Sequence, residues 1–185
     1  MPAIPPEVEA RLIVVTERLK AGELTDGHEI YAAISDLGFY KYVPAWDAVE
    51  PYLRHEDGQI RGRAIFTLAL EMNLVGYRDT CEQMMVEDPD DDARRSAATA
   101  LGHLLSGTHD LDAMKKLARV LRDPSEDVIT RSSAYDSILK ILGAPYTKQQ
   151  LGAYPSHIAM LIERANWDLV EGIEREFDRR EGGEV

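Results

Sequence analysis

The sequence has few cysteines, few basic residues relative to acidic ones, and no long apolar run, and each of these features excludes a class of protein. It contains one cysteine, Cys81, so no disulfide can form within the chain, which is typical of a reducing compartment. It has 21 Lys and Arg residues against 33 Asp and Glu, and this formal net charge of −12 argues against a general binder of phosphate backbones. Apolar runs such as Ala64–Leu70 are far shorter than the ~20 residues that a membrane helix needs. The first residues lack the basic start and apolar stretch of a signal peptide, so we expect a cytoplasmic protein.

Motifs of known chemistry are absent as well. There is no nucleophile elbow, phosphate loop or dinucleotide fingerprint, and the five histidines match no zinc spacing. The nearest metal-like pattern fails at its sixth and twelfth positions, Ala93 and Thr99, after three carboxylates at calcium-loop spacing, Asp88, Asp90 and Asp92. Acidic residues at such a place also suit the N-terminus of a helix. We therefore predict no catalytic residue, no metal site and no cofactor.

What the sequence does contain is helical periodicity. Val8, Leu12, Val15 and Leu19 recur every three or four residues and mark the apolar face of a first helix. No run alternates apolar and polar residues for long enough to form a sheet, and many of the prolines and glycines fall between periodic segments. The chain therefore reads as short helices joined by short turns, an all-α protein.

The helices form a repeat. Two rows of residues recur with the same steps of 31, 33 and 37 positions: the small residues Ala33, Ala64, Ala97 and Ala134, and the larger residues Leu37, Leu68, Leu101 and Ile138. A second helix is expected in each unit, at residues 43–53, 77–86 and 111–121. One such hairpin of about 35 residues cannot bury both of its faces, but stacked hairpins share a continuous core. The alanine row would let neighbouring first helices approach closely.

These residues resemble HEAT repeats, in particular the bacterial HEAT-like type that also occurs in phycobilin lyases. The segment Asp88–Gly102, which reads Asp-Pro, acidic residues, Ala-Arg, Ala-Ala and Ala-Leu-Gly, matches the family unit nearly end to end, and Ile60-Arg61 matches its Val-Arg pair. A third copy keeps Asp123-Pro124 and Val128, with Arg131 as a substitute for the missing Arg if two residues are inserted. The first copy, Ile30–Gly38, keeps the Ala and Leu-Gly positions.

The resemblance implies a right-handed α-solenoid with the first helices on its convex side and the second helices on its concave side. It also implies that Arg61 and Arg94 bridge neighbouring repeats as structural residues. We expect one domain, with an N-terminal cap at residues 1–26, about three and a half repeats at 27–143, and a C-terminal cap at 144–185. The resemblance says little about function, because such repeats serve many binding roles and a few enzymes.

The aromatic segment 39–54 holds five of the thirteen aromatic residues. We expect its apolar residues to form a buried stripe, namely Val43, Trp46, Val49 and Leu53. The outward positions would then be Tyr40, Tyr42, Asp47, Glu50 and Arg54. Tyr and Arg are enriched at binding hot spots, but these aromatics can equally fill the gap between the N-terminal cap and the first repeat. Both interpretations stay open.

A local basic cluster interrupts the acidic chain. Residues 89–123 have six basic and six acidic side chains, and the cations gather on one helix: Lys115, Lys116, Arg119 and Arg122. Cations at the end of a helix complement its dipole, so the cluster is either a structural feature or a binding patch.

We predict a non-catalytic protein-binding module or adaptor that uses the face of its second helices. Acidic residues would steer a protein partner, possibly a basic one, and aromatic residues would anchor it. The predicted contact residues are Tyr40, Tyr42, Asp47, Glu50, Tyr77, Glu82, Asp112, Lys115 and Arg119. An immunity protein that masks a toxin is one alternative within this class.

The alternative from another class is an enzyme or enzyme subunit, similar to a bilin lyase or to a HEAT-like DNA glycosylase. The glycosylase would need a basic groove, with the cluster cations and Arg78 converging beside an exposed tryptophan. We expect neither a nucleic-acid nor a membrane partner, and the sequence does not set the oligomeric state.

Overall fold

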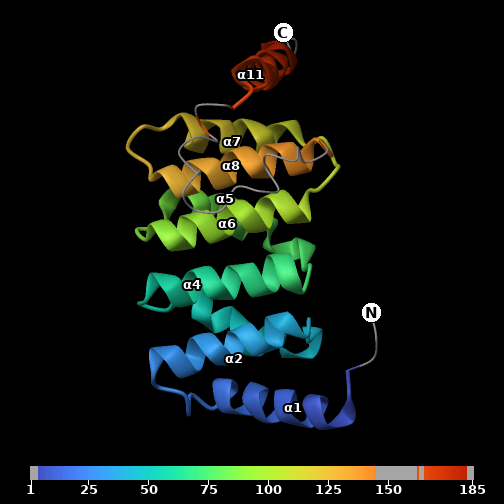
Figure 1. Cartoon of the computed structure of the whole chain (residues 1–185), viewed down its shortest axis with the longest axis vertical. Coiled ribbons are helices and arrows are strands. Elements are labelled where there is room, and N and C mark those ends of the chain that lie inside the picture. Colours follow the sequence, from blue (N-terminus) through green and yellow to red (C-terminus); the bar gives the residue numbers. More distant parts are fainter. Residues whose placement is uncertain (1–3, 145–161, 163–164, 183–185) are drawn as a thin grey trace.

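The computed structural model describes residues 4–144, 162 and 165–182. Within this part of the chain every regular element is helical and there is no β-strand. The helices stack one above another into an elongated array that begins with α1 (Pro6–Lys20) (Figure 1). The predicted all-α solenoid is confirmed.

The first helices of the hairpins form one layer of the array, which we call the first-helix layer. It consists of α2 (Gly27–Phe39), α4 (Gly58–Ile65) with its π-helical extension η3 (Phe66–Glu71), α6 (Asp91–Leu104) and α8 (Val128–Ile141). In Figure 1 these helices lie across the stack in order, from blue to orange.

Each first helix begins after an aspartate whose side chain accepts hydrogen bonds from the first backbone N–H groups: Asp26, Asp57, Asp90 and Asp127. The caps recur with the same steps as the alanine row, so the repeat is defined at the N-terminus of the helix as well as in its core.

Both predicted rows are buried. All eight side chains of the alanine and leucine rows lie in the core. Glycines in this layer allow the backbones of neighbouring helices to come close to each other. A Cβ atom on Gly102 would lie 2.5 Å from the Cβ of Ser137 and 2.7 Å from its Cα. The first helices therefore approach so closely that side chains larger than those present would push them apart.

The second helices form the second-helix layer. It contains α5 (Arg78–Glu87), α7 (Leu111–Arg122) and, in the first hairpin, three short pieces: η1 (Val43–Ala45), α3 (Trp46–Val49) and η2 (Glu50–Arg54). A 3₁₀ turn, η4 (Val75–Tyr77), leads into α5. The predicted helices at 77–86 and 111–121 are confirmed within one or two residues.

The prediction of one α-helix at 43–53 is wrong. Pro51 has no N–H to donate to the carbonyl four residues before it, and the flanking turns are 3₁₀ helices with about three residues per turn. The buried face therefore shifts to Ala45, Ala48 and Val49, while Val43 and Trp46 are 41% and 43% exposed. Leu53, the last residue of the predicted stripe, is partly buried, and Tyr42, expected to face outward, is buried.

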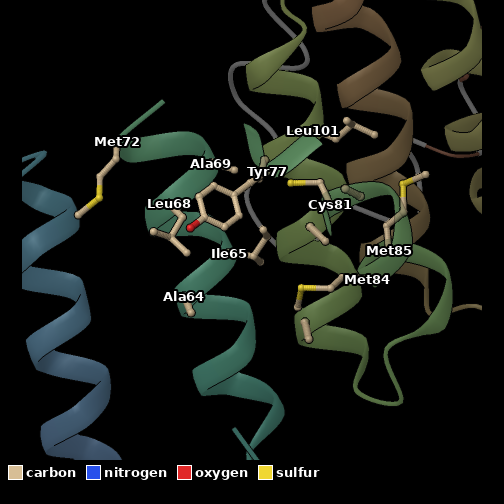
Figure 2. Close-up of a cluster of buried hydrophobic side chains, with 14 of the residues drawn as sticks. Ala64, Ile65, Leu68, Ala69, Met72, Tyr77, Cys81, Met84, Met85 and Leu101 are labelled. Carbon is tan, nitrogen blue, oxygen red and sulfur yellow. The ribbon is translucent and has the colours of Figure 1, made fainter. Parts of the chain in front are cut away.

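The core runs between the two layers. Figure 2 shows Cys81 of α5 among apolar side chains that include Ile65 and Leu68 of the first-helix layer and Met85 of α5. Cys81 is fully buried, and burial, with a smaller effect of Glu82, raises the pKa of its thiol to about 12. In this environment Cys81 acts as a packing residue and not as a nucleophile.

The C-terminal helix α11 (Trp167–Gly182) packs against α7 at the top of the array in Figure 1, with Val170 and Ile173 buried. The remaining part of the predicted cap, residues 145–161 and 163–164, lies outside the described residues, as do 1–3 and 183–185. None of the helices described is both long and apolar enough to cross a bilayer.

Candidate functional site

A groove of about 430 Å³ opens on the second-helix layer, between η2 and α5. Leu53 and Met84 give it apolar surface, and Arg54 is the one cation among the lining residues, against three carboxylates from Glu50, Glu87 and Asp88. The lining therefore carries a formal net charge of −2. We call this site the acidic groove.

A smaller groove of about 190 Å³ follows between α5 and α7. Its surface is mostly apolar, with Met85, Val86 and Val120, and Val86 is largely exposed. Its charged lining residues are Lys116 and Arg119 together with Asp123 and Glu126. The second-helix layer thus offers two successive hollows, one at each junction between neighbouring second helices.

Two of the predicted contact residues, Glu50 and Tyr77, are bonded to each other across adjacent hairpins. The Tyr77 hydroxyl donates to Glu50 at 3.0 Å. Burial raises the pKa of Tyr77, and the hydrogen bond to Glu50 and its negative charge raise it further. Tyr77 is buried and positions Glu50, whereas Glu50 itself lines the acidic groove.

Glu82 and Asp112 belong to an ion-pair network between α5 and α7. Arg78 lies 2.9 Å from Glu82 on its own helix and 2.8 Å from Asp110, the N-cap of α7. Lys116 joins Glu82 at 2.6 Å and Asp112 at 2.7 Å. The bonds to the carboxylates raise the pKa values of Arg78 and Lys116, so both cations stay charged at neutral pH.

Lys115 is covered by α11. Its Nζ lies 3.0 Å from Asp178 and 3.6 Å from the centre of the Phe177 ring. Arg122 is paired with Glu174 through two hydrogen bonds of 3.0 Å. Lys115 is therefore engaged within the chain, while Arg119 is exposed and forms no ion pair with any carboxylate in the described ranges.

The remaining three predicted residues lie near α1. Asp47 is paired with Lys20 at 2.9 Å, and this bond raises the pKa of Lys20. The ring of Tyr40 faces the guanidinium of Arg11 at 5.7 Å. Together with the buried Tyr42, these residues join the first hairpin to the cap, which supports the packing interpretation of the aromatic segment.

Sequence reasoning missed one side of the acidic groove. Thr80, Gln83 and Glu87 line it from α5 and are spaced by three and four residues, the signature of one helix face. This polar stripe could be predicted from the sequence, because its spacing places it on one face of the helix expected at 77–86. The groove itself was not, because Arg54 and Asp88 reach it from other elements.

The predicted structural arginines bridge the turns between hairpins. Arg61 donates to Asp88 through two bonds of 2.6 and 2.8 Å, and Arg94 does the same to Glu126 at 2.6 and 2.7 Å. Burial by itself raises the pKa of Asp88, but Arg61 and a backbone N–H lower it below its usual value. Arg131 occupies the same position in α8, its fourth residue, and donates to the Leu121 carbonyl at 2.8 Å.

The basic groove that a glycosylase would need is not formed by the five candidate cations. Four of these cations are paired with carboxylates, namely Arg78, Lys115, Lys116 and Arg122. The fifth, Arg119, has no carboxylate partner in the described part of the chain. Trp167 is partly exposed, and its ring faces Arg122 at 5.2 Å. A search of the residues placed by the structure also finds no group of His, Cys, Asp and Glu side chains fit to hold a metal.

Comparison with known proteins agrees with the architecture. A family model described as HEAT repeats matches residues 46–138, half of the chain. The 26S proteasome regulatory subunit RPN2 of Eremothecium gossypii is 29% identical over 101 residues, which cover 53% of this chain and 11% of that protein. No solved structure matches. The repeat rows, the capped first helices and the family match lead to one conclusion: the chain belongs to the HEAT-repeat family.

Proposed function

We propose that the chain is a non-catalytic protein-binding module that holds a basic segment of a protein partner in the acidic groove. The observation that carries the proposal is the groove's lining, in which Glu50, Glu87 and Asp88 stand against Arg54. The exposed Val86 and Arg119 of the adjoining α5–α7 groove extend the contact surface. The family supports this class of function, because HEAT arrays offer extended surfaces to other proteins.

Charge would act mainly on the rate and selectivity of association. Complementary charges steer a partner toward the groove, and like charges exclude wrong partners. Because exposed charges are screened over about 8 Å at physiological ionic strength, the association rate should fall as salt rises. A basic toxin masked by an immunity protein would be one partner of this kind. We also propose the cytoplasm as the compartment, since the single cysteine is buried and has no second cysteine in the chain with which to form a disulfide.

The test is affinity purification from the native host with three forms of the chain. Glu87→Lys replaces a carboxylate with a cation at the last residue of α5, where a cation suits the helix dipole, and so neutralises the groove's formal charge of −2. Glu23→Lys makes the same change at an exposed site after α1, outside the groove. We expect a protein that the native chain and Glu23→Lys retain equally and that Glu87→Lys retains about tenfold less, a difference of about 1.4 kcal/mol.

Two results would contradict the proposal. If the native chain retains no protein at either low or moderate salt, the binding function is wrong. If Glu87→Lys retains the partner as well as the native chain does, the acidic groove is the wrong surface.

A further inference from the structure

A second large cavity lies on the first-helix layer, away from the acidic groove. Its volume is about 490 Å³, and it crosses α2, α4, η3, α6 and α8. Small residues line it on three neighbouring first helices, Gly62, Ser96 and Ser133. A Cβ atom on Gly62 would lie 3.1 Å from Ala93 Cα and from Ser96 Oγ, so the helices meet closely beneath the cavity.

The cavity is rich in hydrogen-bond donors. Arg63 and Arg95 line it from adjacent hairpins, and the hydroxyl groups of Ser96, Thr99 and Ser133 lie between and beside them. Asp92 is the single carboxylate in the lining, so its formal net charge is +1. This is opposite in sign to the acidic groove and to the chain as a whole, whose net charge is −12.

Arg63 is held in a fixed position by its neighbours. Its guanidinium pairs with Glu71, lies 5.2 Å from the centre of the Phe66 ring, and occupies space that a side chain on Gly38 would fill. Its Nε is buried and has no hydrogen-bond partner within the described residues. A buried donor without a partner is costly, so an acceptor entering the cavity would gain by bonding to it once the Arg63 side chain shifts.

The other arginine is more accessible. Among the described residues Arg95 pairs only with Asp92, on its own helix, and about a third of its side chain is exposed. At the end of the cavity the ring of Tyr31 is 43% exposed. The site therefore combines two guanidinium groups, several hydroxyl groups and two aromatic rings in one open hollow.

We propose that this cavity binds an extended acidic segment of a protein, separately from the partner of the acidic groove. A carboxylate of the segment accepts hydrogen bonds from Arg63 and Arg95, and its backbone and neighbouring side chains lie along the hydroxyl groups and on the rings of Tyr31 and Phe66. The lining's formal charge of +1, with Glu71 outside the lining balancing Arg63, suits a single carboxylate held mainly by Arg95. It does not suit a nucleic acid, whose binding depends on many cations.

The test uses fluorescence anisotropy with the full chain and two labelled peptides, one of alternating glutamate and serine and one of alternating lysine and serine. Two variants probe the cavity. Arg95→Gln removes an exposed guanidinium, and Gln59→Glu adds a charge to the lining at the second residue of α4, where the helix dipole favours it. Their matched controls are Arg175→Gln, on the exposed surface of α11, and Gln83→Glu, on α5.

We expect the acidic peptide to bind the native chain and both controls with equal affinity. Each cavity variant should weaken this binding about tenfold, or about 1.4 kcal/mol, while circular dichroism shows unchanged helix content. The NMR resonance of the Arg63 Nε–H group should shift on titration with the acidic peptide, and Glu87→Lys should leave its affinity unchanged.

Either of two results overturns the inference: no binding of the acidic peptide, or unaltered binding of the acidic peptide by both cavity variants. Tighter binding of a single-stranded oligonucleotide than of the acidic peptide would also overturn it. These outcomes are independent of the host-partner experiment, since that test changes a different surface.

Discussion

The two layers of this array are held together in different ways. In the first-helix layer neighbouring helices meet through glycine, alanine and serine, with backbone atoms near van der Waals contact at Gly102 and Gly62. In the second-helix layer long polar side chains span the gap, as in the Tyr77–Glu50 hydrogen bond and the Arg78–Asp110 ion pair. Where backbones are close, no room remains for charged pairs, and where they are farther apart, charged pairs supply the contacts.

The same difference sets the charge of the two hollows. Carboxylates reach the acidic groove from η2, α5 and the turn after it, while the first-helix cavity is lined by hydroxyl groups and two arginines. An acidic protein thus has a local site of the opposite sign. The total charge of a chain is therefore a poor guide to what one face of a repeat array can bind.

The largest effect should come from the turns that join both layers. In Arg61→Met, the buried Asp88 loses its bidentate partner, and the carbonyl groups of His55 and Glu56 lose a donor. Because the side chains of Arg61 and Asp88 are only 12% and 6% exposed, we expect the free energy of unfolding to fall by about 3 kcal/mol. Unfolding in urea measures this change in the free energy of unfolding. Arg175→Met, at an exposed pair, should cost less than about 0.5 kcal/mol, and equal losses would refute a special role for the turn.

The next effect tests close packing in the first-helix layer. In Gly102→Ala, the new methyl group meets the backbone of Ser137, so α6 and α8 must separate at a cost of about 1–3 kcal/mol. Gly172→Ala in α11 has open space around it and should instead gain up to about 1 kcal/mol from helix propensity. Thermal unfolding of the two variants should shift in opposite directions. A shift of the same sign would show that packing at Gly102 is looser than the structure has it.

A smaller effect separates stability from binding in the second-helix layer. Tyr77→Phe removes the hydroxyl that donates to Glu50, and we expect the free energy of unfolding to fall by about 1 kcal/mol. The freed Glu50 carboxylate should make the acidic groove bind the lysine peptide more tightly. Tyr31→Phe makes the same change on the first-helix layer, where no hydrogen bond of the hydroxyl is found in the described chain, and should alter neither quantity. Weaker lysine-peptide binding by Tyr77→Phe would count against the acidic groove as its site.

The smallest effect concerns acid stability. Burial by itself raises the pKa of Asp127, but hydrogen bonds from Thr130 and from backbone N–H groups, together with Arg95, lower it below its usual value. Such a carboxylate stabilises the fold above its unfolded pKa of about 3.9, and that contribution is lost as the pH falls through the lower folded value.

Asp127→Asn keeps a good helix cap but cannot titrate, so stability near pH 7 should change by only a few tenths of a kcal/mol. The decline of stability below about pH 4 should become shallower than in the native chain. Chemical unfolding measured across the acid range tests this. An unchanged slope would mean that Asp127 is not stabilised as a carboxylate in the folded state.

Much of the fold could be predicted because its signals are local. The alanine and leucine rows follow from spacing, and the bridging arginines follow from the family unit. The structure agrees with both. The segment 43–53 was misassigned because two prolines and 3₁₀ turns change the helical period. Trp46 therefore faces outward, and Tyr42, just before the segment, is buried. The contact residues were harder to predict from the sequence. Whether such a side chain is free to bind depends on ion pairs and hydrogen bonds with residues that lie far away in the chain.

The sequence by itself determined that this protein is a stack of helical hairpins, because helical period, capping aspartates and small residues act over a few positions. Only the tertiary structure decided which charges remain available. Arg78 finds Asp110 at a separation of 32 residues, and Lys115 finds Asp178 at 63. Such pairs arise from the way hairpins stack, and they leave a negative hollow on one layer and a positive hollow on the other.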